Sequence, residues 1–147
     1  MRYFSSLDEF IQQHSSRVDF ITEEWIEQNI SQADIESASL RVIQSSEKSW
    51  QRYADQKGVD WTGYLEALGF GYVDLNEFYV YELIGEDFYL HASYCGDLEV
   101  EIELEESHTL SRRIETEFVV VEVFLEMECK VRNRKIEDLK LESWGFA

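Results

Sequence analysis

The chain has 147 residues, of which 44% are hydrophobic and 14% aromatic, and its 13 Lys and Arg against 31 Asp and Glu give a formal charge of −18. This apolar content excludes a disordered acidic tail, and the length is sufficient to bury a core without disulfides or a metal. The charge argues against direct binding to nucleic acid or to an anionic membrane, and it predicts a basic protein as the partner.

Two short helices are predicted at the start of the chain. Ser6 and Glu9 form a capping box, in which each side chain accepts a hydrogen bond from the other residue's backbone amide, and it opens a helix over 6–14. Apolar residues three and four positions apart then indicate a second helix from about Val18 to Glu27, with its glutamates facing water.

A longer helix is predicted over 35–57, with Gly58 in the left-handed position that ends it. Two alternatives remain open for this segment. The serines at Ser45-Ser46 can interrupt the helix, and residues 39–43 can form a short strand. A further short helix, capped by Asp60, is predicted over 61–68.

From Tyr72 onward the apolar residues recur at every second position, which predicts β-strands. Gly85-Glu86 is predicted as a two-residue hairpin turn that sets Tyr81 opposite Leu90 and directs the tyrosine toward the core. Cys95-Gly96-Asp97 is predicted as the next turn, because a three-residue loop there keeps apolar side chains together on one face.

A long strand is predicted over 113–132, and a final strand over 136–142 follows a turn at Arg132-Asn133-Arg134. The acids of the long strand change from odd to even positions, so a β-bulge is expected near Val120. The predicted fold class is therefore α+β, in which N-terminal helices pack on one face of a C-terminal antiparallel β-meander of about five strands.

The whole chain, 1–147, is predicted to form a single α+β domain, mainly helical over 1–70 and an antiparallel sheet over 71–147. The two cysteines form no CxxC pair, which favours a reduced cytoplasmic setting. The sequence contains no P-loop, dinucleotide fingerprint or nucleophile elbow; no cofactor or metal ion is predicted, and no catalytic residues are assigned.

The strongest functional signal is the distribution of charge. No Lys or Arg occurs from Gly58 to Ser111, and these 54 residues hold 13 acids. In the predicted register Glu99, Glu101, Glu103 and Glu105 point away from the core at intervals of about 6.7 Å. They lie opposite Ser93, His91, Tyr89 and Asp87, in that order. The predicted partner-binding residues are Glu99, Glu101, Glu103, Glu105, Glu115, Glu117, Asp87, Tyr89 and Phe78.

These observations predict a non-enzymatic acidic protein that inhibits a nucleic-acid-binding protein by occupying its basic surface, in the manner of a nucleic-acid mimic. In charge and size the chain is similar to small acidic inhibitors, a class that includes anti-restriction proteins, anti-CRISPR proteins and immunity proteins of nuclease toxins. The targets implied by this similarity are nucleases, toxins and CRISPR or restriction effectors.

Three alternatives remain. The acids can be a solvated face that provides solubility and protects strand edges. Phe78 and Tyr89 can anchor a structural or assembly contact, including a homodimer. Glu126, Glu128 and Lys130 can form the metal site of a nuclease, since Glu128-Cys129-Lys130 resembles the ExK end of restriction-like sites.

Overall fold

The computed structural model describes residues 19–82, 87–108 and 111–147, so the predicted helix 6–14 and the predicted turn at Gly85-Glu86 lie outside the described residues. The described chain contains three helices followed by a four-stranded antiparallel sheet of order β1-β2-β3-β4. The helices are α2 (Glu23–Asn29), α3 (Gln32–Gln44) and α4 (Glu47–Gln56). The strands are β1 (Asp60–Glu82), β2 (Phe88–His108), β3 (Ser111–Arg132) and β4 (Lys135–Phe146). The α+β fold is confirmed, with four strands rather than five.

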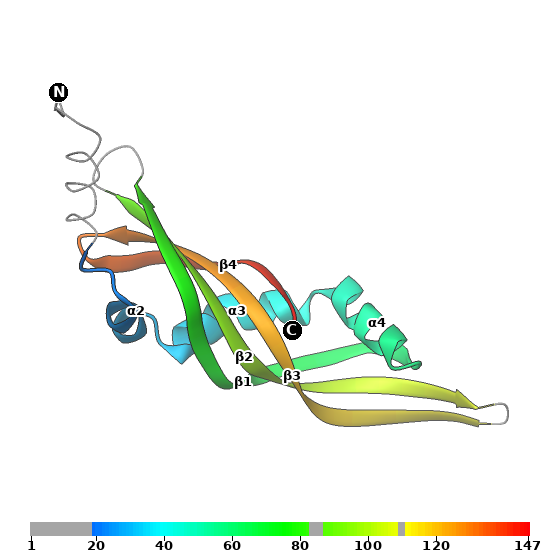
Figure 1. Cartoon of the computed structure of the whole chain (residues 1–147). Coiled ribbons are helices and arrows are strands. Elements are labelled where there is room, and N and C mark those ends of the chain that lie inside the picture. The colour runs from blue at the N-terminus through cyan, green and yellow to red at the C-terminus, as the bar shows by residue number, and fades with distance from the viewer. Residues whose placement is uncertain (1–18, 83–86, 109–110) are drawn as a thin grey trace, which may run out of the picture.

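The helices lie along one side of a long, strongly twisted sheet (Figure 1). The predicted helix 35–57 is interrupted at Ser45-Ser46, so α3 and α4 are separate helices and the strand alternative at 39–43 is wrong. Ser31 caps α3 through a capping box with Asp34, which was not predicted. Gly58 follows α4 with a φ of 73°, in the left-handed conformation that was predicted.

The predicted helix over 61–68 is wrong, because β1 begins at Asp60. This part of β1 is irregular, with register shifts against β2, and β1 is an edge strand of the described sheet, so the backbone groups on its outer edge have no strand partner there. Side chains of α3 satisfy some of them: Gln44 accepts from the Ala67 amide at 3.0 Å, and Glu36 accepts from the Phe70 amide at 3.1 Å. Contacts with α3 and β2 therefore override the local helical pattern.

The predicted turn at Cys95-Gly96-Asp97 is also wrong, because β2 continues through these residues without a break. This error accounts for the missing fifth strand. Gly96 allows β1 and β2 to approach each other closely and does not form a turn. A Cβ at this position would lie 2.6 Å from the backbone oxygen of Tyr72 on β1.

We expect Gly96→Ala to lower the free energy of unfolding by about 1–3 kcal/mol, because the added methyl group forces β1 and β2 apart. Gly71→Ala is the matched control. Its Cβ would meet nothing closer than Glu99 Oε1 at 3.5 Å, so its effect should stay within about 0.5 kcal/mol. Urea denaturation of both variants measures the difference, and equal effects would contradict this account of Gly96.

The pairing of β1 with β2 differs by one residue from the prediction, with Tyr81 opposite Tyr89 and Val80 opposite Leu90. A shift of one residue exchanges the two faces of a strand. The aliphatic side chain of Val80 therefore packs on the core, whereas Tyr79 and Tyr81 are exposed. Phe78, predicted to point outward, lies opposite Ala92 on the core face, so that prediction is wrong.

Strands β2 and β3 pair without interruption from Phe88 and Val131 to His108 and Ser111, so the bulge predicted near Val120 is absent from this ladder. The turn before β4 is confirmed, with positive φ at Asn133 and Arg134.

The core joins the helices to the inner face of the sheet and contains Trp50 of α4, which is fully buried. The Trp50 ring packs against Tyr53, Trp144 and Phe146, and its indole N–H donates to the Ile43 carbonyl at 2.8 Å. The aromatic end of β4 is thereby held against α4, near the C-terminus in Figure 1.

Candidate functional site

The side chains of β2 alternate strictly between the core and the opposite, outer face of the sheet. Leu98, Val100 and Ile102 are fully buried, so the residues between them face outward. The four glutamates of the prediction, Glu99, Glu101, Glu103 and Glu105, therefore share the outer face. Their predicted neighbours were wrong, because β2 does not fold back on itself and β1 and β3 flank these residues instead.

Three acid–acid pairs lie directly across neighbouring strands on this face. Glu105 is opposite Asp60, and Glu101 is opposite Glu66, both on β1. Asp97 is opposite Glu122 of β3. We call the set of outward carboxylates from these pairs and the β2 row the acidic face: Asp60, Glu66, Asp97, Glu99, Glu101, Glu103, Glu105 and Glu122. Like charges directly opposite each other destabilise a sheet, so the fold gains no stability from these pairs.

Three neighbouring glutamates of the acidic face have no ion-pair partner among the described residues. Within residues 19–82, 87–108 and 111–147, Glu99, Glu101 and Glu103 form no ion pair with a cationic side chain. Desolvation and the hydrogen bond that Tyr64 donates to Glu66 raise the pKa of the Tyr64 phenol, and the negative charges of the nearby glutamates raise it further.

Glu115 and Glu117 do not extend the acidic face, contrary to the prediction. They lie opposite Leu104 and Ile102, whose side chains point to the inner face. Glu115 also forms an ion pair with Arg113, at 2.7 Å between Oε1 and Nη2. The prediction failed because it assumed a β-bulge near Val120, which would have brought Glu115 and Glu117 onto the same face as the later acids of β3.

The outer face of β3 instead presents apolar side chains beside the glutamates of β2. Phe118 lies opposite Glu101 and Val120 opposite Glu99, and their exposed fractions are 59% and 52%. Ile114, opposite Glu105, is also 59% exposed. Strand parity could have revealed them, since Phe118 and Val120 share even numbering with Glu122.

Aromatic side chains occupy the other end of the outer face. Tyr89, a predicted anchor, does point outward, and its ring stacks on Tyr81 with centroids 5.5 Å apart. Tyr79, 55% exposed, stacks on His91 at 4.8 Å. These rings form a second surface that is distinct from the acidic face.

His91 was predicted to pair with Glu101, but its Nε2 lies 2.6 Å from Glu126 Oε2 on β3. Ser93 donates to the same oxygen at 2.6 Å. Desolvation by itself raises the pKa of Glu126, but the hydrogen bonds from Ser93 and His91 outweigh it, so the pKa lies below its ordinary value. Glu126 is thus fixed as an ionised acceptor.

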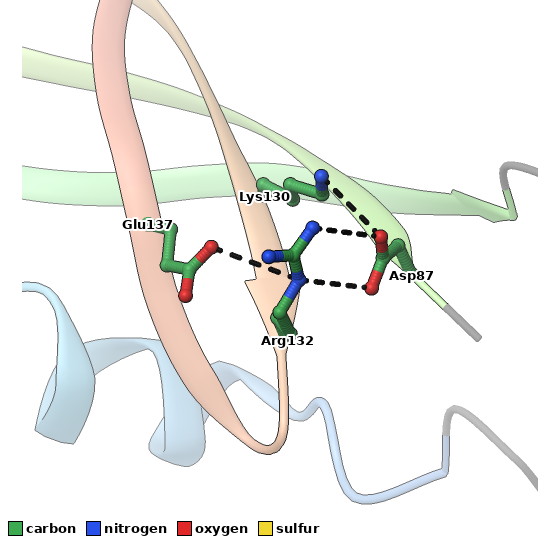
Figure 2. Close-up of polar contacts among 4 residues, drawn as sticks. All are labelled: Asp87, Lys130, Arg132 and Glu137. Carbon is green, nitrogen blue, oxygen red and sulfur yellow. Dashed lines mark hydrogen bonds and ion pairs between the residues drawn. The ribbon is translucent and has the colours of Figure 1, made fainter.

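Asp87, the residue just before β2, lies in a mixed ion cluster with Lys130, Arg132 and Glu137 (Figure 2). Arg132 donates to both of its oxygens, at 3.2 Å from Nε and 3.1 Å from Nη2, and Lys130 Nζ lies 3.3 Å away. Glu137 approaches Arg132 at 3.9 Å. The hydrogen bond from Arg132 lowers the pKa of Asp87, helped by Lys130. The negative charge of Asp87 is therefore compensated by Arg132 and Lys130 of the same chain.

We expect Asp87→Asn to lower the midpoint of thermal unfolding at pH 7, and this difference should shrink in acid. Because Arg132 lowers the folded-state pKa, the folded protein binds this proton more weakly than the unfolded chain does. The stabilisation is present above the unfolded pKa of about 3.9 and is lost as the pH falls through the folded value. Scanning calorimetry of both proteins, with Asp74→Asn, an exposed aspartate of β1, as an isosteric control, tests this. A difference that does not depend on pH would contradict it.

The three residues of the nuclease alternative, Glu126, Glu128 and Lys130, each form a hydrogen bond or an ion pair with another side chain of the protein. Glu128 accepts from the Tyr81 phenol at 2.7 Å, which raises the pKa of Tyr81 to about 12, and Lys130 pairs with Asp87. Among the described residues, no group of three or more His, Cys, Asp or Glu side chains is arranged to hold a metal ion. The geometry offers no positive support for the nuclease alternative.

In the described part of the chain, no helix combines the length and the apolar character needed to cross a bilayer. Comparison with family models, with curated proteins and with solved structures finds no match to this chain. The functional conclusion therefore depends on the geometry and charge of the outer face.

Proposed function

We propose that this protein is a non-enzymatic acidic binding protein that inhibits a nucleic-acid-binding protein by occupying its basic surface. The observation that carries the proposal is the acidic face, on which Glu101 lies opposite Glu66 and Asp97 opposite Glu122, and the described residues supply no ion-pair partner to Glu99, Glu101 or Glu103. An arrangement that costs the fold stability is expected where a cationic partner supplies the compensating charge.

The geometry of the acidic face suits the imitation of a nucleic-acid strand. Strand β2 spaces its outward carboxylates about 6.7 Å apart in one row, a repeat comparable with that of phosphates along a strand. Targets of the proposed class are nucleases, toxins and CRISPR or restriction effectors, whose nucleic-acid grooves are basic. We include a reducing cytoplasmic setting in the proposal, since both cysteines, Cys95 and Cys129, are free thiols.

The experiment is capture of partners from native lysate at low salt, followed by a salt gradient and mass spectrometry. The proposal expects a basic nucleic-acid-binding protein that elutes at moderate salt, because exposed charge pairs are screened. Added single-stranded or duplex DNA or RNA should compete with the chain for this protein. A captured protein that still binds its nucleic acid with the chain attached would contradict the proposal.

A second candidate function is a structural or assembly module that binds through the aromatic surface. The exposure of Tyr79 and the stacking of Tyr81 on Tyr89 favour it, because rigid aromatic side chains are common interface anchors. Under this alternative Tyr89→Ala should weaken binding more than any charge change, and salt should have little effect. The salt gradient therefore separates the two candidates.

A further inference from the structure

In the part of the chain that the structure describes, half of strand β3 has no partner strand on one edge. Strand β4 pairs with β3 only from Val123 to Arg132, and the Ala147 amide donates to the Glu122 carbonyl at 3.0 Å as the last contact of that row. From Ser111 to Glu122, β3 pairs with β2 alone within the described chain. Figure 1 shows this end of the β2–β3 hairpin extending past the C-terminal end of β4.

Of the features that usually prevent strand addition, this edge has charged side chains, Arg113, Glu115 and Glu117, but neither a proline nor a bulge against β2. Exposed edges in monomeric proteins are typically short, bulged, interrupted by proline or protected by lysine. Here the paired register is unbroken, and the chain contains no proline. Three exposed apolar side chains, Ile114, Phe118 and Val120, lie on one face of the edge. The backbone and side chains together are suited to receive another strand.

Charge around the edge indicates which strand it receives. On the outer face the glutamates of β2 flank the apolar row, and on the inner face Glu115 and Glu117 lie on β3 itself. Arg113 already pairs with Glu115 within the chain, and a second copy would bring a further formal charge of −18, so long-range repulsion disfavours it. A segment that combines lysine or arginine with apolar residues fits instead.

We propose that the open edge of β3, Ser111–Glu122, takes up an extended cationic and apolar segment of a partner as an additional strand in the row that β4 leaves empty. Main-chain hydrogen bonds would provide affinity, and the alternating side chains would provide selectivity. This inference deepens the proposed function, on which it rests for a basic partner, by naming the element of that partner that is bound.

The test uses a capped peptide of about ten residues, alternating lysine and valine, which matches the length of the open edge. Two analogues carry backbone N-methyl groups, on the lysines in one and on the valines in the other. In an added strand only alternate amides face β3, so one analogue should bind at least about tenfold more weakly than the other. Equal binding of the two analogues would overturn the proposal, because it would mean contact through side chains alone or no contact.

Substitutions in the protein locate the site. Val120→Lys should weaken peptide binding by about tenfold or more, because it places a cation on the open edge. The matched control is Phe124→Lys, also an exposed apolar residue of the outer face, but one where β4 covers the edge opposite Gly145. Equal effects of the two substitutions would overturn the assignment. So would sedimentation that shows a homodimer broken by Val120→Lys, since a second copy would then occupy the edge.

The result of the peptide test can be distinguished from the result of the capture experiment that tests the proposed function. Failure to capture a basic nucleic-acid-binding protein leaves the peptide measurements unchanged. Conversely, captured partner together with equal binding of the two N-methylated analogues would mean that the partner contacts the acidic face without adding a strand.

Discussion

Reversal of Glu101 and Glu103 to lysine is expected to reduce affinity for the basic partner on the order of 100-fold, which corresponds to about 3 kcal/mol. Both side chains lie at the centre of the acidic face, where each reversal replaces an attraction by a repulsion. Most of the loss should appear at low salt, where screening is weakest. Titration calorimetry or surface binding at two salt concentrations measures it.

The same double reversal should leave folding intact or slightly improve it, because it replaces the like-charge pair of Glu101 with Glu66 by an attractive one. The matched control reverses Glu27 on α2 and Asp55 on α4, two exposed acids on the helical side, with the same change in net charge. If control and test variants lose equal affinity, net charge rather than the acidic face determines binding. An unchanged affinity of the test variant would contradict the proposed function itself.

Trp50→Ala is expected to lower the free energy of unfolding by about 3–5 kcal/mol, a large part of the stability of an ordinary domain. The Trp50 side chain is fully buried, and its removal leaves a cavity among Tyr53, Trp144 and Phe146. The Ile43 carbonyl also loses the indole donor at 2.8 Å. Chemical denaturation followed by circular dichroism measures the loss.

Trp25→Ala is the control for this second prediction. Trp25 lies on α2, is only half-buried and makes an edge-to-face contact with Phe20, so its removal should cost no more than about half as much. Equal losses for the two tryptophans would contradict the central position of Trp50 in the core. Because β4 is held through Trp50, amide exchange near Trp144 should also accelerate in Trp50→Ala.

Local pattern was sufficient to predict several elements of the candidate site. The alternation from Leu98 to Glu105 places hydrophobic and acidic side chains on opposite faces of any strand, whichever strands lie beside it. The outward direction of the four glutamates therefore followed from the sequence even though their predicted neighbours were wrong. The break at Ser45-Ser46 and the left-handed Gly58 likewise arise from local backbone preferences.

Other features depend on contacts between distant residues. The sequence around Gly96 is compatible with a glycine in a turn and with a glycine inside a strand. Only the close approach of the Tyr72 carbonyl on the neighbouring strand shows that Gly96 belongs to a strand. The helical pattern over 61–68 is overridden because α3 and β2 supply partners for the backbone of β1.

By itself, then, the sequence determined that helices precede an antiparallel sheet and that Glu99, Glu101, Glu103 and Glu105 share a face, because these features depend on periodicity along one segment. The tertiary structure alone decided the register. It placed Glu115 and Glu117 on the inner face, exposed Phe118 and left the Ser111–Glu122 edge of β3 without a partner strand among the described residues. The physical reason is that a one-residue shift between strands exchanges their faces, and long-range packing selects among such shifts.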